Sequence, residues 1–152
     1  MFIGQATCRC GRPECDGGSL DKRLIIGTEE YDSYLPGYDS DVTSGFRCPF
    51  WNIHEGGSEK SFHPKRMAID FKTRGLTPQD MVPVAEMVDI FYNGGIGVYI
   101  YDKNYPGWDP EKFKGKTGFL HCDIRGWKAR WFFINRIQQT YGAMVESRIF
   151  DL

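Results

Sequence analysis

Two histidines and two aspartates lie at positions from which they could bind a metal ion together. His63 precedes Asp70 by seven positions, and His121 and Asp123 follow much later in an apolar run. One imidazole, one carboxylate and a second imidazole form a common ligand set for catalytic zinc, which keeps a further position open for water or substrate. The residue types therefore predict a zinc centre, provided that the fold brings them together.

The strands expected around these residues decide which of the side chains can reach one metal ion. Side chains alternate across a strand, so His121 and Asp123 should share one face, and Asp123 could then take a proton from a zinc-activated water. His63 can reach the metal beside Asp70 only if the chain turns back between them. Other interpretations stay open, because Asp70 could cap a turn and Asp123 could pair with Arg125 or Arg130.

Three cysteines near the N-terminus form a second group of potential ligands. They are Cys8, Cys10 and Cys15. They could bind a small structural metal ion, completed by Cys48 or His54, although their spacing matches no standard Cys-x-x-Cys pair. The alternative is reduced thiols in a turn-rich loop, with Cys48 and Cys122 as small buried hydrophobic residues.

Bulk composition narrows the function classes. The 152 residues suit one domain over 1–152, with a cysteine-containing loop at 1–19 and a C-terminal extension at 132–152. Hydrophobic content of 41% predicts a globular chain, and a net charge of -1 without a basic face argues against nucleic-acid binding. We expect no membrane span, since no apolar stretch approaches ~20 residues. The start lacks a secretory signal, so we expect synthesis in the cytoplasm, and the odd number of cysteines argues against a disulfide framework.

The hydrophobic pattern predicts a mixture of helices and strands. Expected helices cover 19–35 and 77–92, with Thr77 as the cap of the second and Pro83 as a possible kink, and a terminal helix carries Ile134, Ile137, Tyr141 and Val145. Expected strands cover 42–46, 67–71, 97–101, 119–124 and 129–133, with loops at 51–62 and 102–118. Because the order lacks βαβ regularity, we predict an α+β fold with a central antiparallel sheet and helices packed on one side.

Several short motifs follow one another along most of the chain. They are Ser44-Gly45-Phe46-Arg47-Cys48-Pro49, Asn52, Gly56-Gly57-Ser58, Ser61-Phe62-His63 through Ala68-Ile69-Asp70, Gly94-Gly95-Ile96-Gly97-Val98-Tyr99, His121-Cys122-Asp123-Ile124-Arg125-Gly126 and Ala129-Arg130-Trp131. In this order they resemble the M15 metallopeptidases, zinc D-Ala-D-Ala carboxypeptidases and peptidoglycan endopeptidases, particularly short bacterial and phage members. The resemblance implies a Hedgehog/DD-peptidase-like fold.

The resemblance also implies a role for each site residue. The implied zinc ligands are His63, Asp70 and His121. Asp123 would be the general base or a close partner of the metal water, although relatives with a His-x-His sequence leave open which of His121 and Asp123 is the third ligand. Arg47 would hold the substrate and stabilise the oxyanion. Ser61 and Tyr99, inside matched motifs, would contact the substrate.

Three departures from the family pattern accompany these expectations. Arg66 stands where glycine is usual, the loop 102–118 is long, and the segment after Trp131 has no counterpart. Our first hypothesis is a monomeric zinc peptidase that cuts peptidoglycan stems or cross-links, acts on the bacterial cell wall and derives from a phage or prophage. The alternatives are a zinc-bearing module without hydrolysis, and an interaction domain whose main metal site is the cysteine group.

Overall fold

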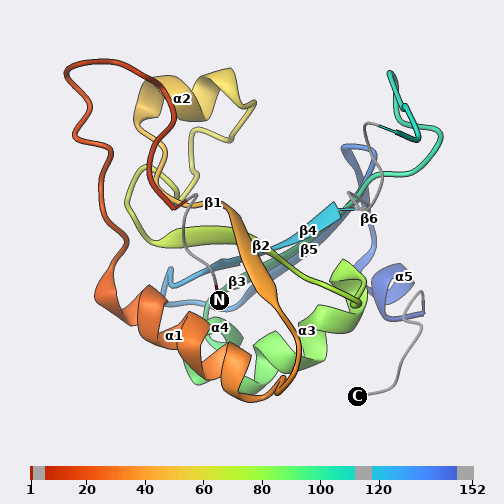
Figure 1. The fold of residues 1–152 in the computed structure, drawn as a ribbon. Coiled ribbons are helices and arrows are strands. Elements are labelled where there is room, and N and C mark those ends of the chain that lie inside the picture. Colours follow the sequence, from red (N-terminus) through yellow and green to blue (C-terminus); the bar gives the residue numbers. More distant parts are fainter. Residues whose placement is uncertain (2–5, 112–117, 147–152) are drawn as a thin grey trace.

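The computed structural model describes residues 1, 6–111 and 118–146 of the chain (Figure 1). Its described strands are β1 (Ser40–Ser44), β2 (Ala68–Thr73), β3 (Gly95–Ile100), β4 (Gly118–Asp123), β5 (Ala129–Ile134) and β6 (Ile137–Gln139). Its described helices are α1 (Lys22–Ser33), α2 (Pro49–His54), α3 (Pro78–Met87), α4 (Asp89–Tyr92) and α5 (Tyr141–Glu146). Helices and strands thus share one fold, which confirms the predicted α+β class.

The described strands form one sheet in the order β1-β2-β4-β3-β5-β6. Neighbouring strands are antiparallel except for β3 and β5, which run parallel. Residues 124–128 create this exception, because they carry the chain from the end of β4 past the start of β3 to the other side of that strand. The sheet is therefore mixed, and the prediction of an antiparallel sheet was wrong for this pair.

The two faces of the sheet differ in character. Alternate residues of a strand point to opposite faces, and one face packs its apolar side chains against α1, α3 and α4. These side chains are Ile69, Phe71, Ile96, Val98, Leu120, Cys122 and Phe132. Figure 1 shows these three helices below the sheet, with α2 and residues 6–18 above it. The long helices thus cover one face, as predicted, and leave the other face free for polar groups.

Local signals in the sequence account for the helix starts. Asp21 caps α1 by accepting a hydrogen bond from the backbone N–H of Arg23, and Thr77 caps α3 by accepting one from the N–H of Asp80. Pro78 occupies the first turn of α3, as expected. The second predicted helix is divided, because the fully buried Val88 adopts an extended conformation between α3 and α4.

Two segments differ from the prediction. Part of the expected loop 51–62 belongs to α2, which starts at Pro49, a favourable first residue for a helix. The expected terminal helix is instead the β5–β6 hairpin followed by α5. The turn of this hairpin consists of Asn135 and Arg136, whose φ values of 51° and 67° are the left-handed conformations that a tight two-residue hairpin turn requires.

Parts of two other predictions lie outside the described residues. Residues 112–117 belong to the expected loop 102–118, and residues 147–152 belong to the proposed C-terminal extension. Residues 2–5 of the cysteine-containing loop are likewise not described. Among the helices of the described residues, none combines the length and the apolar character needed to cross a bilayer.

Candidate metal centre

A single row across the sheet carries two of the predicted ligands. Asp70 on β2 lies opposite His121 on β4, and His121 in turn lies opposite Gly97 on β3. Gly97 is paired with Trp131 on β5. Since directly opposed residues point to the same face, these side chains gather on the face that the long helices leave free.

His63 reaches this row through a tight turn ahead of β2. The N–H of Met67 donates to the carbonyl of Phe62, and the N–H of Arg66 donates to the carbonyl of His63. Arg66 has a φ of 65°, in the left-handed region that glycine adopts most readily. The family preference for glycine here therefore has a conformational reason. The chain between His63 and Asp70 therefore turns back as the metal site requires, although position 66 is arginine and not glycine.

The three predicted ligands converge on one carboxylate oxygen. Oδ1 of Asp70 lies 3.2 Å from Nε2 of His63 and 2.8 Å from Nδ1 of His121. All three side chains are buried, and their potential ligand atoms lie within 4.8 Å of one another. Ligands ~2.0–2.1 Å from a tetrahedral zinc ion would be ~3.3 Å apart. The donor set and its spacing therefore fit zinc, and these residues could bind a metal ion.

The ring of His63 is held so that one nitrogen is available to a metal. Its Nδ1 lies 2.6 Å from the carbonyl oxygen of Gly45. A carbonyl can only accept a hydrogen bond, so Nδ1 carries the proton and Nε2 faces Asp70 as a lone pair when the ring is neutral. The N–H of His63 also donates to Oγ of Ser61 at 3.2 Å. Ser61, predicted to contact substrate, thus supports the turn that holds His63.

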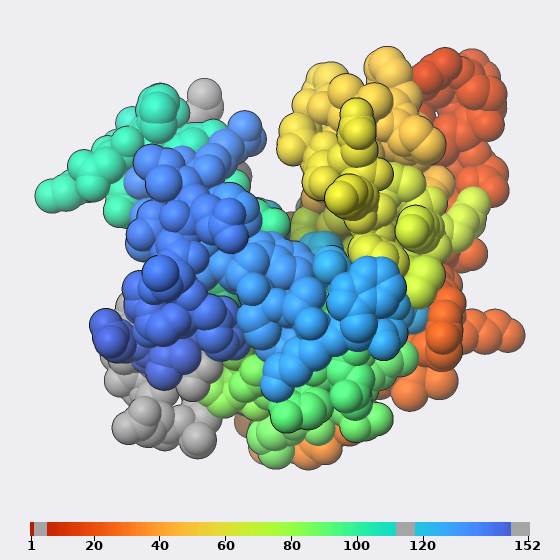
Figure 2. Space-filling view, turned by 180° about the vertical axis from the view of Figure 1, so that it is seen from behind, coloured from red at the N-terminus to blue at the C-terminus, as the bar shows by residue number. Residues whose placement is uncertain are grey.

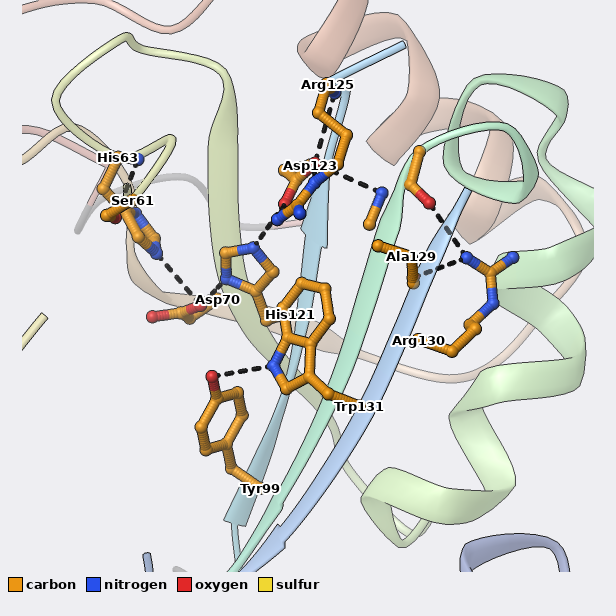
Figure 3. Close-up of polar contacts among 12 residues, drawn as sticks. Ser61, His63, Asp70, Tyr99, His121, Asp123, Arg125, Ala129, Arg130 and Trp131 are labelled. Atoms are coloured by element: carbon orange, nitrogen blue, oxygen red, sulfur yellow. Dashed lines mark hydrogen bonds and ion pairs between the residues drawn. The ribbon is translucent and has the colours of Figure 1, made fainter. Parts of the chain in front are cut away.

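Asp123 lies behind His121, on the side away from Asp70. Its Oδ2 is 2.9 Å from Nε2 of His121 (Figure 3). The side chain of Asp123 is fully buried. Arg125 donates to both of its oxygens, from Nε at 2.8 Å and from Nη2 at 2.6 Å, and the N–H of Gly95 donates to Oδ1 at 3.2 Å. The pairing with Arg125 that the sequence left open is therefore formed. Among the described residues, Asp123 is not one of the three grouped as potential ligands.

The buried charges of the centre shift one another's pKa values. Burial alone would raise the pKa of Asp70, but the rings of His63 and His121 hold it well below its usual range. Burial would lower the pKa of His121, whereas its hydrogen bonds to Asp123 and Asp70 raise it to about 9. Burial would raise the pKa of Asp123, but Arg125 and His121 hold it well below its usual range. Without a metal, His121 thus lies as a protonated ring between two ionised carboxylates.

Arg47 contacts the same carboxylate from the other side. Its Nη2 donates to Oδ2 of Asp70 at 2.6 Å, and its Nε donates to Oγ of Ser44 at 2.8 Å. Only 14% of its side chain is exposed, so this is not a surface ion pair. Asp70 thus offers one oxygen to the imidazoles and the other to Arg47, which fixes the plane of the carboxylate.

Trp131 is a part of the centre that the residue types did not reveal. Its indole ring lies 5.2 Å from the ring of His121, and its Nε1 donates to the hydroxyl of Tyr99 at 2.8 Å (Figure 3). A Cβ on Gly97 would lie 2.2 Å from that Nε1, so the glycine makes room for the indole. A glycine inside a strand, paired with a tryptophan, was the available signal. Tyr99, predicted to contact substrate, stacks between Phe119 and Phe133.

The molecular surface is hollowed on the far side from the long helices. Figure 2 shows the hollow between the yellow segment, around residues 50–65, and the teal and blue segments of 101–111 and the β5–β6 hairpin. The turn of His63 belongs to the first wall, and the strand of Trp131 leads into the second. A substrate in this hollow would therefore meet residues from both parts of the chain.

The cysteines of the N-terminal loop form a second group of potential ligands, separate from His63, Asp70 and His121. Cys48 joins Cys8, Cys10 and Cys15, with all four sulfur atoms within 4.8 Å of one another. The prediction that Cys48 is a buried hydrophobic residue was wrong, because it is half-buried against other thiols, whereas Cys122 is fully buried. His54, the other candidate for this group, instead stacks on Trp51 with ring centres 4.4 Å apart.

Comparison with known proteins adds one match. A family model described as Peptidase M15 matches residues 28–105, or 78 of the 152 residues. The matched region contains Arg47, His63 and Asp70, while His121 lies beyond it. No curated protein matches the chain, and no solved structure does so either.

Proposed function

Because the chain belongs to the peptidase M15 family, we propose that it hydrolyses peptide bonds in the stems or cross-links of peptidoglycan with the help of one zinc ion. The observation that carries this proposal is the position of Asp70, whose Oδ1 lies beside both His63 and His121. In this proposal the protein acts as a monomer on the bacterial cell wall and is a phage or prophage lytic enzyme.

Each proposed ligand has a second partner that holds it in place. The carbonyl of Gly45 fixes His63, Arg47 fixes Asp70, and Asp123 fixes His121. Outer hydrogen bonds of this kind orient metal ligands and set the tautomer of each imidazole. When bound, zinc supplies Lewis-acid activation of water and of the scissile carbonyl.

Asp123 is assigned the positioning of His121. Its two oxygens already accept hydrogen bonds from Arg125, Gly95 and His121, and its pKa lies well below the usual range. A carboxylate stabilised in its ionised form takes up a proton less readily. It holds the proton of His121 at Nε2 and thereby directs Nδ1 toward the metal.

Arg47, Tyr99 and Trp131 would contact the substrate. Peptidoglycan stems carry free carboxylates, and a guanidinium is well suited to bind them or to stabilise an oxyanion. Arg47 uses Nε and Nη2 for Ser44 and Asp70, and its remaining N–H groups can serve this purpose. The stacked rings around Tyr99 provide a flat apolar surface against which a short peptide can pack.

A second candidate function follows from the environment of Asp123. If hydrolysis requires a carboxylate that can take up a proton beside the metal, the hydrogen bonds of Asp123 favour a zinc-bearing module that binds the cell wall without cleaving it. Such a module would retain the three ligands and the hollow. It would bind sacculi with zinc present and release no new amines.

One experiment separates these two functions. Zinc-loaded protein is incubated with purified sacculi, and the soluble products are identified by mass spectrometry while bound protein is measured by sedimentation. We expect new peptide termini, and we expect His63→Ala to reduce their release to background. His54→Ala is the matched control, because His54 stacks on Trp51 outside the centre and its removal should leave activity intact.

The product pattern decides the outcome. Peptide release by wild type and His54→Ala but not by His63→Ala supports the peptidase. Zinc-dependent sedimentation without any new termini supports the binding module and contradicts the peptidase. Equal release by His63→Ala would contradict both, because neither function would then depend on this metal ligand.

A further inference from the structure

The four clustered thiols have the spacing of a metal site. The sulfur atoms of Cys8, Cys10, Cys15 and Cys48 all lie within 4.8 Å of one another, and none is in a disulfide. Four thiolates around a tetrahedral zinc ion, at ~2.3 Å from it, are ~3.8 Å apart. A contraction of less than about 1 Å would therefore complete the coordination shell.

Backbone N–H groups point at two of the four sulfur atoms. The N–H of Cys48 points at the sulfur of Cys8 at 3.3 Å, and the N–H of Arg12 points at the sulfur of Cys10 at 3.4 Å. Such N–H groups stabilise negative charge on sulfur. Cys10 and Cys15 are separated by four residues, within the range usual for paired zinc ligands.

The loop that carries these cysteines is held by polar contacts and not by buried apolar side chains. Between Ala6 and Leu20 no residue is buried, and residues 6–18 contain neither helix nor strand. A segment without an apolar core usually needs a disulfide or a metal ion for a fixed conformation. Yet this loop has a defined path, with the N–H of Cys8 donating to the carbonyl of Gly17.

We propose that Cys8, Cys10, Cys15 and Cys48 bind a structural zinc ion, which fastens the N-terminal loop to the turn that carries Arg47. Cys48 directly follows Arg47, whose guanidinium contacts Asp70. The same turn is also tied to the N-terminal segment by the N–H of Phe46, which donates to the carbonyl of Ala6 at 2.7 Å. Metal binding at the thiols would thus limit the motion of Arg47 without contact with the substrate.

Metal counting tests this site independently of hydrolysis. Protein purified under reducing conditions is analysed for zinc by mass spectrometry of the metal. We expect two zinc ions per chain in wild type and one in Cys10→Ser or Cys15→Ser. Cys122→Ala is the matched control, because this thiol is buried in the core away from the cluster and its loss should leave two zinc ions. His63→Ala should lose one zinc ion and keep the thiol-bound one.

Cobalt substitution provides a second measurement on the unaltered chain, in case the cysteine variants do not fold. Cobalt bound by four thiolates gives strong sulfur-to-metal charge-transfer absorption and the intense visible bands of a tetrahedral ion. Their appearance in wild type and in His63→Ala supports the proposal. A cobalt spectrum without thiolate bands, or a zinc content that does not change in Cys10→Ser and Cys15→Ser, would overturn it. Alkylation showing these cysteines paired in disulfides after reducing purification would also overturn it.

Discussion

Nε2 of His121 lies 2.9 Å from Oδ2 of Asp123, and this contact fixes which nitrogen of the ring carries the proton. An ionised carboxylate can only accept, so when a metal takes the place of the proton beside Asp70, the one proton left on the ring resides on Nε2 and Nδ1 faces the metal position. In many zinc sites a carboxylate holds the second nitrogen of a histidine ligand in this way, and it fixes the orientation of the ring and raises the affinity for the metal. It makes Asp123 a determinant of metal affinity.

We therefore predict that Asp123→Asn lowers zinc affinity by about 10- to 100-fold, the usual loss when such an outer partner is removed. The asparagine cannot accept charge-assisted hydrogen bonds from both Arg125 and His121. Competition with a chelating dye measures the affinity. Activity at saturating zinc should be largely recovered.

The matched control for this variant is Asp89→Asn, since Asp89 contacts Asn93 at an exposed position far from the centre. It should leave zinc affinity unchanged. An Asp123→Asn variant with wild-type zinc affinity and no turnover would contradict the positioning role and would assign Asp123 the role of proton acceptor instead.

Gly97→Ala should disturb the centre from within the sheet. The added methyl group would collide with the indole of Trp131, whose ring also contacts His121. Overpacking of this kind costs about 1–3 kcal/mol of unfolding free energy, which urea titration followed by circular dichroism would measure. Gly142→Ala is the control, because Gly142 lies in α5 with no atom within 4 Å of the new methyl group. Equal stability of the two variants would show that the indole does not occupy this space.

The conformation of Arg66 gives a prediction about the His63 turn. Arg66→Ala and Arg66→Gly both remove the contacts of this side chain with Asp16 and the ring of Phe46. Only glycine also relieves the left-handed backbone. Arg66→Gly should therefore be more stable than Arg66→Ala by about 1 kcal/mol in denaturant unfolding. An alanine variant as stable as the glycine variant would mean that the turn relaxes out of this conformation.

The raised pKa of His121 predicts how the metal-stripped protein responds to alkali. The pKa of His121 in the folded protein, about 9, exceeds its ordinary value of 6.5. The protonated ring therefore stabilises the folded protein fully below pH 6.5, and this stabilisation is lost as pH rises through about 9. The pKa values of Asp70 and Asp123 lie below their ordinary value of 3.8, so their contribution is lost as pH falls below it. The Tm of stripped protein should thus fall on both sides of this window.

Zinc should remove the alkaline limb of this profile, because it binds the neutral imidazole and takes the place of the proton. Melting curves of stripped and zinc-loaded protein across pH check this expectation. His121→Asn in the stripped form is the control and should lose most of the fall between pH 6.5 and 9. A stripped wild type with a flat profile over that range would contradict the assignment of the proton to His121.

Much of the fold could be predicted because its strands and caps are local signals. The apolar run before Asp70 and the Thr77-Pro78 start were read correctly from neighbouring residues alone. The hairpin turn at Asn135 and Arg136 was missed, since neither position is glycine. The parallel β3–β5 pair depends on how the chain passes from β4 to β5, which no local pattern specifies.

The metal centre, like the fold, could be predicted from the sequence only in part. Residue types and order were sufficient to nominate His63, Asp70 and His121, and the fold brings them together. The partners of these ligands depend on strand register, which decides that Trp131 covers Gly97 and that Arg125 holds Asp123. Cys48 and His54 were both candidates to complete the cysteine group, and because all of α1 and β1 separate Cys48 from Cys15, choosing between the two candidates required the tertiary structure.

An anomalous difference map at the zinc edge, from crystals grown with zinc, tests the proposed metal centre itself. We predict a peak at ~2.0–2.2 Å from Nε2 of His63, Oδ1 of Asp70 and Nδ1 of His121. Absence of density there in a fully zinc-loaded crystal, or a zinc ion that binds without these three side chains, would contradict the proposed centre.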